Sequence, residues 1–335
     1  MARSYPNQAA TLPPVRRAGS ISSLARVISI LTMLVLLVGL CLTPPAAAAQ
    51  TPDHSSLQVV ASFSVLGDLA KRVGGDLVNV TTLIGPGVDA HTYDPAPADL
   101  VTLEDADVII ENGLGYEPWL DRYFASTQPA GLRVVASDGI APRQLGPGEV
   151  RDEEDHGQFD PHVWHNVANA IVMVGNIRDA LVAADPAHAA EYKANAAATT
   201  ADLQALDAWV REQVATLPPE RRKLVTSHDT FGYFADAYGF TVVGTALGSL
   251  STEAGDPSAR EIATLIDEIA AAGVPAIFAE NVSNPDLMNS IAAEAGVVLA
   301  PPLYSDALGP AGSPGDTYDG MIRSNVTTIV SALSQ

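Results

Sequence analysis

The sequence predicts an α/β protein of two lobes, each built on a mostly parallel sheet, with one long helix joining them. Two observations predict this class. Short apolar runs alternate with helical patterns in both halves of the chain, and one uninterrupted helical pattern separates the halves. We expect an N-terminal lobe over residues 50–185, a connecting helix over 186–217 and a C-terminal lobe over 218–335. Such sheets bind ligands beyond the carboxyl ends of their strands.

The first 49 residues have the three parts of a secretory signal peptide. An apolar run of 16 residues extends from Val27 to Leu42 and is short for a membrane-spanning helix. The small-residue stretch PPAAAAQ follows it, so we expect cleavage near Ala49. The charges before the run are all basic: Arg3, Arg16, Arg17 and Arg26. We therefore expect a protein secreted across the inner membrane, to the periplasm or the cell surface.

The single cysteine, Cys41, lies inside this apolar run. A bacterial lipoprotein would be acylated at such a cysteine, but Leu40 precedes it where a small residue is expected. We favour cleavage and leave a lipid anchor open. Without Cys41 the mature chain has no disulfide and no thiolate, so any metal must be bound through nitrogen and oxygen.

The mature chain is strongly acidic. Loss of the signal peptide leaves 14 basic residues against 39 acidic ones, a net charge of −25. Nucleic acid is excluded as a partner because its phosphates need Lys and Arg. The charge suits attraction of cations, although a solvated acidic surface accounts for it equally well.

Four strands are predicted in the N-terminal half, at residues 57–63, 78–84, 108–112 and 132–137. A helix around Leu66–Val73 separates the first two strands, and Asn166–Ala184 has apolar residues at helical spacing. Strands that alternate with helices in this way form parallel sheets.

The connecting segment follows Pro186 and contains no Gly or Pro before Pro218. It has an apolar face because its large apolar residues fall three or four apart. These residues are Leu203, Leu206, Val210, Val214 and Leu217. The pattern predicts one helix of about 30 residues, about 45 Å long, which is enough to bridge two lobes.

The C-terminal half repeats the alternation, with strands predicted at 222–227, 240–246, 275–281 and 296–302. Ser258 and Glu261 form a capping box that opens a helix up to Ala272. Asn284 and Pro285 are interpreted as the N-cap and first position of a helix ending at Ala295.

Candidate metal ligands fall beyond several predicted strands. His91 follows the strand at 78–84, His228 follows the one at 222–227, and Asp306 follows the one at 296–302. His162 precedes a helix, and Glu280 ends the strand at 275–281. Three imidazoles and one carboxylate suit a tetrahedral site, and nitrogen-rich sites bind zinc more tightly than manganese.

The stretch DPHVWHN holds His162 and three other residues of interest. Asp160 either orients His162 or caps the following helix, and we favour the cap. His165 lies three residues after His162 and is interpreted as a hydrogen-bonding neighbour rather than a ligand. Trp164 is assigned to the core.

Four motifs in order resemble those of metal-binding receptors of bacterial zinc and manganese ABC importers, the group with the TroA-like fold. They are GPGVDAHTYDPAPADL, DPHVWHNVANA, TSHDTFGYFADAYG and LYSDALG. The resemblance covers about residues 56–333 and implies two α/β lobes, one rigid helix and a metal held in the cleft between the lobes. It also implies that the loop GSLSTEAGD at 248–256 responds to metal.

The resemblance implies His91, His162, His228 and Asp306 as the metal ligands, with Glu280, His165 and Asp160 as supporting neighbours. Manganese-type members often carry Glu where this chain has His228, which favours zinc, although some members with three His and one Asp also take manganese. Two features depart from the zinc-type pattern. The loop before His162 is acidic with only His156, and the C-terminal lobe has no disulfide.

We therefore expect a monomeric receptor that captures Zn²⁺ and passes it to a membrane permease. Its ATPase must be a separate subunit because the chain lacks GxxxxGK[ST]. The alternatives are a manganese-specific receptor, a zinc hydrolase and a surface adhesin. We do not expect an enzyme, since four protein ligands leave no position for a catalytic water. No repeats support an adhesin.

Overall fold

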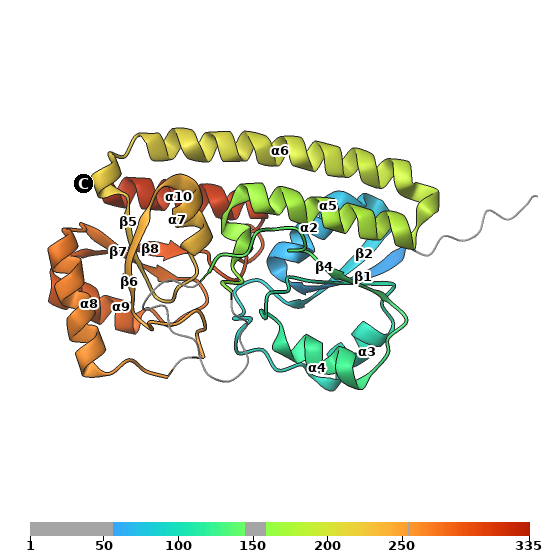
Figure 1. The fold of residues 1–335 in the computed structure, drawn as a ribbon, viewed down its shortest axis with the longest axis horizontal. Coiled ribbons are helices and arrows are strands. Elements are labelled where there is room, and N and C mark those ends of the chain that lie inside the picture. The colour runs from blue at the N-terminus through green and yellow to red at the C-terminus, as the bar shows by residue number, and fades with distance from the viewer. Residues whose placement is uncertain (1–55, 145–158, 254) are drawn as a thin grey trace, which may run out of the picture. The chain divides into compact units, whose positions relative to one another are not determined.

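The computed structural model describes residues 56–144, 159–253 and 255–335. The predicted signal peptide with Cys41 and the acidic loop around His156 lie outside these residues, so the expectations about them remain predictions. Within the described residues the alternation of strands and helices follows the predicted α/β class (Figure 1).

The N-terminal lobe is built on one four-stranded parallel sheet in the order β2-β1-β3-β4. β1 pairs with β2 along its length and with β3 over Val59–Ala61, so that Val59 lies between Val80 and Val108. The strands are β1 (Leu57–Phe63), β2 (Val78–Ile84), β3 (Val108–Glu111) and β4 (Leu132–Val135). All four predicted strands are confirmed, the last two with slightly shorter bounds.

Helices cover this sheet and lead the chain toward the second lobe. α2 (Ser64–Gly74) and α5 (Val167–Ala184) contact each other, and the pair α3 (Pro97–Glu104) and α4 (Pro118–Ser126) lies at the other side of the lobe (Figure 1). Asn166 caps α5 by accepting a hydrogen bond from the backbone of Ala168. By length and composition α5 is apolar enough to span a membrane, but it packs on α2, α6 and the sheet.

The connecting helix α6 (Ala189–Ala215) is 27 residues and therefore about 40 Å long. It begins after a 3-10 turn, Pro186–His188, which shortens it relative to the expectation. α6 runs along α5 and α2 of the N-terminal lobe and along α10 (Tyr318–Leu333) (Figure 1). The predicted apolar face is buried, at about 1.5–3 kcal/mol per large side chain.

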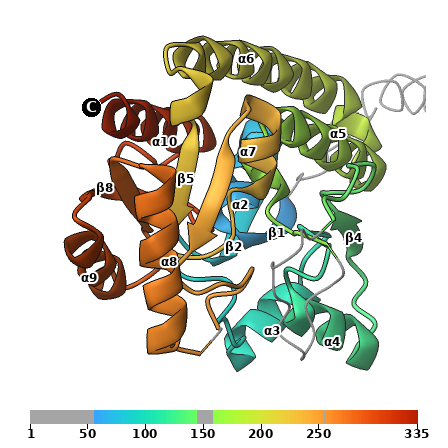
Figure 2. The ribbon, with the colours of Figure 1, turned by 60° about the vertical axis from the view of Figure 1, so that its left-hand side comes forward.

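The C-terminal lobe holds two parallel strand pairs, β5-β6 and β7-β8, with β5 packed against β7 (Figure 1). α10 packs beside β8 (Figure 2). Its strands are β5 (Lys223–Thr226), β6 (Thr241–Thr245), β7 (Ala276–Glu280) and β8 (Val298–Leu303). The predicted strands are confirmed. The predicted capping box of Ser258 and Glu261 opens α8 (Ala259–Ala272).

One predicted helix start is shifted by a residue. α9 (Asp286–Ala295) begins after Pro285 rather than at it, and the carboxamide oxygen of Asn284 accepts a hydrogen bond from the backbone N–H of Asp286. Asn284 therefore lies one residue before the N-cap, Pro285, and bonds to the first residue of the helix.

Four helices have no counterpart among the predicted elements: α3, α4, α7 (Gly232–Tyr238) and α10. Three of them are nine residues or shorter, too few for a clear helical period. α10 is longer, opens with Thr317 as its cap and packs on α6 and β8.

Candidate metal centre

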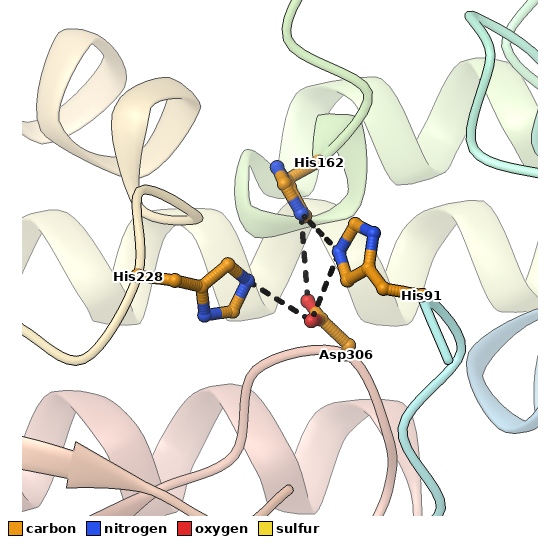
Figure 3. Close-up of side chains that lie close together, drawn as sticks. All are labelled: His91, His162, His228 and Asp306. Carbon is orange, nitrogen blue, oxygen red and sulfur yellow. Dashed lines mark hydrogen bonds and ion pairs between the residues drawn. The ribbon is translucent and has the colours of Figure 1, made fainter. Parts of the chain in front are cut away.

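Four side chains from distant parts of the sequence meet in the interior: His91, His162, His228 and Asp306 (Figure 3). One ligand-type atom from each lies within 4.8 Å of all the others, and all four residues are buried. Burying three imidazoles and one carboxylate together costs free energy unless they are hydrogen-bonded, ion-paired or bound to a metal. The cluster is therefore a candidate metal site.

The distances between the donor atoms fit one small cation. Nε2 of His91 lies 3.3 Å from Nε2 of His162 and 3.4 Å from Oδ2 of Asp306. Nε2 of His228 lies 3.0 Å from that same oxygen. A tetrahedron with metal–ligand bonds of about 2.0–2.1 Å has edges of about 3.3–3.4 Å. The two contacts of His91 therefore match the edges of a tetrahedral zinc site, and the contact of His228 with Asp306 is somewhat shorter.

Three of the four residues follow parallel strands, as the sequence predicts. His91 lies in the loop after β2, His228 lies two residues beyond β5, and Asp306 lies three residues beyond β8. Both lobes thus direct strand ends toward one point. His162 enters differently, from the residue that precedes the 3-10 turn η2 (Val163–His165).

Asp160 holds His162 in place. Its Oδ1 lies 2.9 Å from Nδ1 of the His162 ring and accepts a hydrogen bond from the His162 backbone at 2.9 Å. The favoured expectation of a helix cap is wrong, since Asn166 caps α5. Gly232 permits the approach of α7, because a Cβ there would come within 2.6 Å of Asp160 Oδ2.

Glu280 plays the same part for His228. Its Oε2 pairs with Nδ1 of His228, and its Oε1 accepts hydrogen bonds from the backbone N–H groups of Ser227 and His228, both at 3.0 Å. With Nδ1 engaged, Nε2 of each imidazole faces the cluster. A carboxylate behind a ligating histidine orients the ring and raises its basicity.

The pKa values of His162 and His228 are shifted in opposite directions. Burial lowers the pKa of His162 well below its usual range. Burial also opposes charge on His228, but the carboxylates of Glu280 and Asp306 outweigh it and raise that pKa well above the usual range. Despite burial, His228 in turn holds the pKa of Asp306 well below its ordinary value.

The loop that carries Asp306 is fixed from two directions. The carboxamide of Asn281 accepts a hydrogen bond from Ser305 N and donates one to Ala307 O, both at 3.0 Å. From the other lobe, the indole N–H of Trp164 donates to Ser305 O at 3.0 Å. Trp164 is in the core as expected, and it also joins His162's turn to Asp306's loop.

His165 lies outside the cluster, as interpreted from the sequence. Its Nε2 is 3.1 Å from the hydroxyl of Thr230, and that hydroxyl is 3.2 Å from Oδ1 of Asp306. Burial, followed by the neighbouring His162, lowers the pKa of His165 to about 3, so the ring is neutral.

A buried glutamate supports the His162 loop from the N-terminal lobe. Glu117 accepts hydrogen bonds from Ser62 Oγ at 2.6 Å and from Asn112 N at 2.7 Å. Asn112 then donates its side-chain N–H to Pro161 O at 2.9 Å. Burial, and next the charge of Glu111, raises the pKa of Glu117 to about 8.

Sequence reasoning missed several supporting residues, namely Thr230, Asn281, Asn112 and Glu117. It also missed Asp89, whose Oδ1 accepts a hydrogen bond from the His91 backbone. Asn281 and Asn112 each follow the last residue of a strand, a position at which a polar residue could have been marked. Thr230 and Asp89 lie two residues from a candidate ligand, but no spacing rule selects them.

A surface pocket of about 700 Å³ lies elsewhere, between α3 and α4, lined by Leu100, Trp119 and Tyr123 among others. It shares no residue with the buried cluster. The convergent titratable groups, rather than pocket size, therefore mark the candidate site.

Comparison with known proteins gives consistent matches over most of the chain. A sequence model of the family described as "Zinc-uptake complex component A periplasmic" matches residues 59–332. The manganese-binding lipoprotein MntA of Halalkalibacterium halodurans is 39% identical over 284 residues, covering 84% of this chain and 90% of that protein.

The zinc-binding protein TroA of Treponema pallidum is 37% identical over 283 residues, covering 83% of this chain and 89% of that protein. A solved structure of the periplasmic zinc-binding protein TroA matches with a TM-score of 0.75 at 34% identity, covering 84% of this chain and all of that one. The two-lobe fold predicted from the sequence is confirmed by this match.

Proposed function

We propose, from the premise that this chain belongs to the family of periplasmic zinc-uptake component A proteins, that it is an extracytoplasmic metal receptor of an ABC importer. Its cargo is one divalent transition-metal ion per chain. The ion is captured by His91, His162, His228 and Asp306 and delivered to a membrane permease.

One observation carries the proposal: four buried donors of metal-binding type converge within 4.8 Å. Asp160 and Glu280 stand behind two of the imidazoles and turn their Nε2 atoms toward the common point. Carboxylate–histidine pairs of this kind are typical of metal sites, where they fix the tautomer and ring orientation.

Zinc is the cargo that we propose. Three nitrogens and one oxygen form a donor set that binds zinc more tightly than manganese. The two distances from His91 Nε2, to His162 and to Asp306, are close to tetrahedral zinc edges. Manganese is the second candidate, because the relative from Halalkalibacterium halodurans is named a manganese-binding protein.

The number of donors supports a receptor rather than a hydrolase. Catalytic zinc has three protein ligands and one open position for water. Here four protein donors surround the point where the ion would bind, so no position remains for a water nucleophile. The permease and a separate ATPase subunit are the proposed partners, and we propose that the receptor works as a monomer.

The direct test is elemental analysis of protein purified without added metal, followed by titration with Zn²⁺ in competition with Mn²⁺. We expect one zinc per chain and preference for zinc. Preferential binding of manganese would reverse the choice of cargo, and the absence of stoichiometric binding of either ion would overturn the receptor proposal.

The ligand set is tested by His91→Ala, His162→Ala, His228→Ala and Asp306→Ala. Each should lower zinc affinity by at least about a hundredfold, more than the loss of a supporting neighbour. His188→Ala is the control, since His188 pairs with Asp185 at the start of α6. A variant that binds zinc like the wild type would remove that residue from the set.

A further inference from the structure

We infer that Thr230 fixes the coordination number of the metal by holding one oxygen of Asp306 away from it. The inference rests on the proposed function and deepens it, because it names a residue that selects between cargo ions. Thr230 lies within the motif TSHDTFGYFADAYG, but it is not one of the four proposed ligands and the resemblance gives it no role. It lies two residues beyond His228 and is fully buried.

The position of the Thr230 hydroxyl is set by the loop that carries His228. The backbone N–H of Thr230 donates to the carbonyl oxygen of His228 at 3.1 Å. The hydroxyl then lies 3.2 Å from Asp306 Oδ1 and 3.1 Å from His165 Nε2. Thr230 thereby joins a residue from each of two other loops.

The direction of these hydrogen bonds follows from the available protons. His165 is a neutral imidazole whose Nδ1 has no hydrogen-bond partner among the described residues. Placing its one ring proton on Nε2 lets it donate to the Thr230 oxygen. The hydroxyl proton of Thr230 is then directed to Asp306, whose carboxylate can only accept.

The two oxygens of Asp306 are consequently unequal. Oδ2 lies 3.0 Å from Nε2 of His228 and 3.4 Å from Nε2 of His91, which are tetrahedral edge lengths. Oδ1 lies 3.7 Å from Nε2 of His162 and receives the Thr230 proton. Oδ2 is therefore the ligand, and Oδ1 is weakened as a donor to the same ion.

A single oxygen from Asp306 gives four donors in all, the number that zinc prefers. Without the hydrogen bond from Thr230, both oxygens of Asp306 could bind the ion, and Oδ1 would become a fifth donor. Manganese favours more, and oxygen-richer, ligands than zinc does. The Thr230 hydroxyl thus acts against manganese without touching either ion.

The test compares Thr230→Val, which keeps the shape but removes the hydroxyl, with Thr230→Ser, which keeps the hydroxyl. Two readouts are needed: the visible spectrum of the Co²⁺-loaded protein, which is intense for four-coordinate Co²⁺, and the ratio of Zn²⁺ to Mn²⁺ association constants. We expect the wild type and Thr230→Ser to give the intense spectrum. Thr230→Val should give a weaker one, with the affinity ratio lowered by about tenfold.

The inference is overturned if Thr230→Val keeps both the wild-type spectrum and the wild-type ratio. It is also overturned, without any variant, if the wild-type protein holds Co²⁺ with five or six ligands. Either result leaves the proposed function standing. Failure of the wild type to bind any of the three ions would instead overturn the proposed function itself, and the inference with it.

Discussion

Glu280 makes three contacts with the loop that carries His228: it accepts hydrogen bonds from two backbone N–H groups and pairs with Nδ1 of the His228 ring. The single carboxylate therefore sets both the position of the loop after β5 and the charge felt by the imidazole.

Glu280→Gln should keep the backbone hydrogen bonds through its remaining oxygen but remove the negative charge beside Nδ1. Because His228 then becomes a weaker base, we expect zinc affinity to fall by about ten- to a hundredfold. Competition with a chelator of known affinity measures the change. Glu294→Gln on the exposed face of α9 is the control and should bind as the wild type does. Equal affinities for all three proteins would contradict the role.

Zinc binding should release about one proton at pH 7. The raised pKa of His228 means that its ring is protonated in the metal-free protein, and a ligating imidazole must be neutral. Asp306, with its lowered pKa, is already ionised and releases none. Apparent affinity should therefore rise with pH by about tenfold per unit below the His228 pKa. Calorimetry in buffers of different ionisation enthalpy counts the proton, and a count of zero would contradict this assignment.

Asp89 joins the metal-binding loop to the segment at 248–253. Its Oδ1 accepts a hydrogen bond from the His91 backbone at 3.0 Å, and its Oδ2 accepts one from Thr252 Oγ1 at 2.5 Å. Thr252→Val should therefore speed zinc release several-fold, since a hydrogen bond to a charged group is lost. Stopped-flow chelation measures the rate, and Thr264→Val on α8 is the control. Identical release rates would show that the contact does not retain the ion.

Zinc binding should change the dimensions of the protein little. α6 packs on α2 and α5 of one lobe and on α10 beside the other, so wide hinge motion would break a continuous buried face. We expect local ordering of loops around the cleft. Small-angle scattering with and without zinc tests this, and a large compaction on zinc addition would contradict it.

Glu117 should make the metal-free protein less stable as pH rises. Its pKa is about 8 in the folded protein, against an ordinary value of 4.5, so its favourable contribution is complete below pH 4.5 and is lost as pH rises through 8. The effect is on the order of a few kcal/mol. Urea unfolding between pH 5 and pH 9 should show a shallower pH dependence for Glu117→Gln than for the wild type. Parallel pH profiles would contradict the raised pKa.

The sequence alone predicted the eight strands, the long helix and the four residues of the cluster. The strands can be predicted because apolar β-branched runs are bounded by turn residues. α6 can be predicted because its apolar residues recur at helical spacing with no Gly or Pro between them. The missed helices α3, α4 and α7 are too short to show a period, and their ends are set by tertiary packing.

The tertiary structure decided what each polar neighbour does. Asp160 could cap a helix or orient His162 as far as sequence shows, and the 2.9 Å contact with Nδ1 decides for the ring. No sequence pattern assigns a role to Thr230 or Asn281, yet the two residues fix the Asp306 loop by contacts across 76 and 26 residues. Local sequence patterns indicate which face of a segment is buried. Hydrogen bonds between distant loops cannot be predicted from them, because these bonds form only when the lobes have folded together.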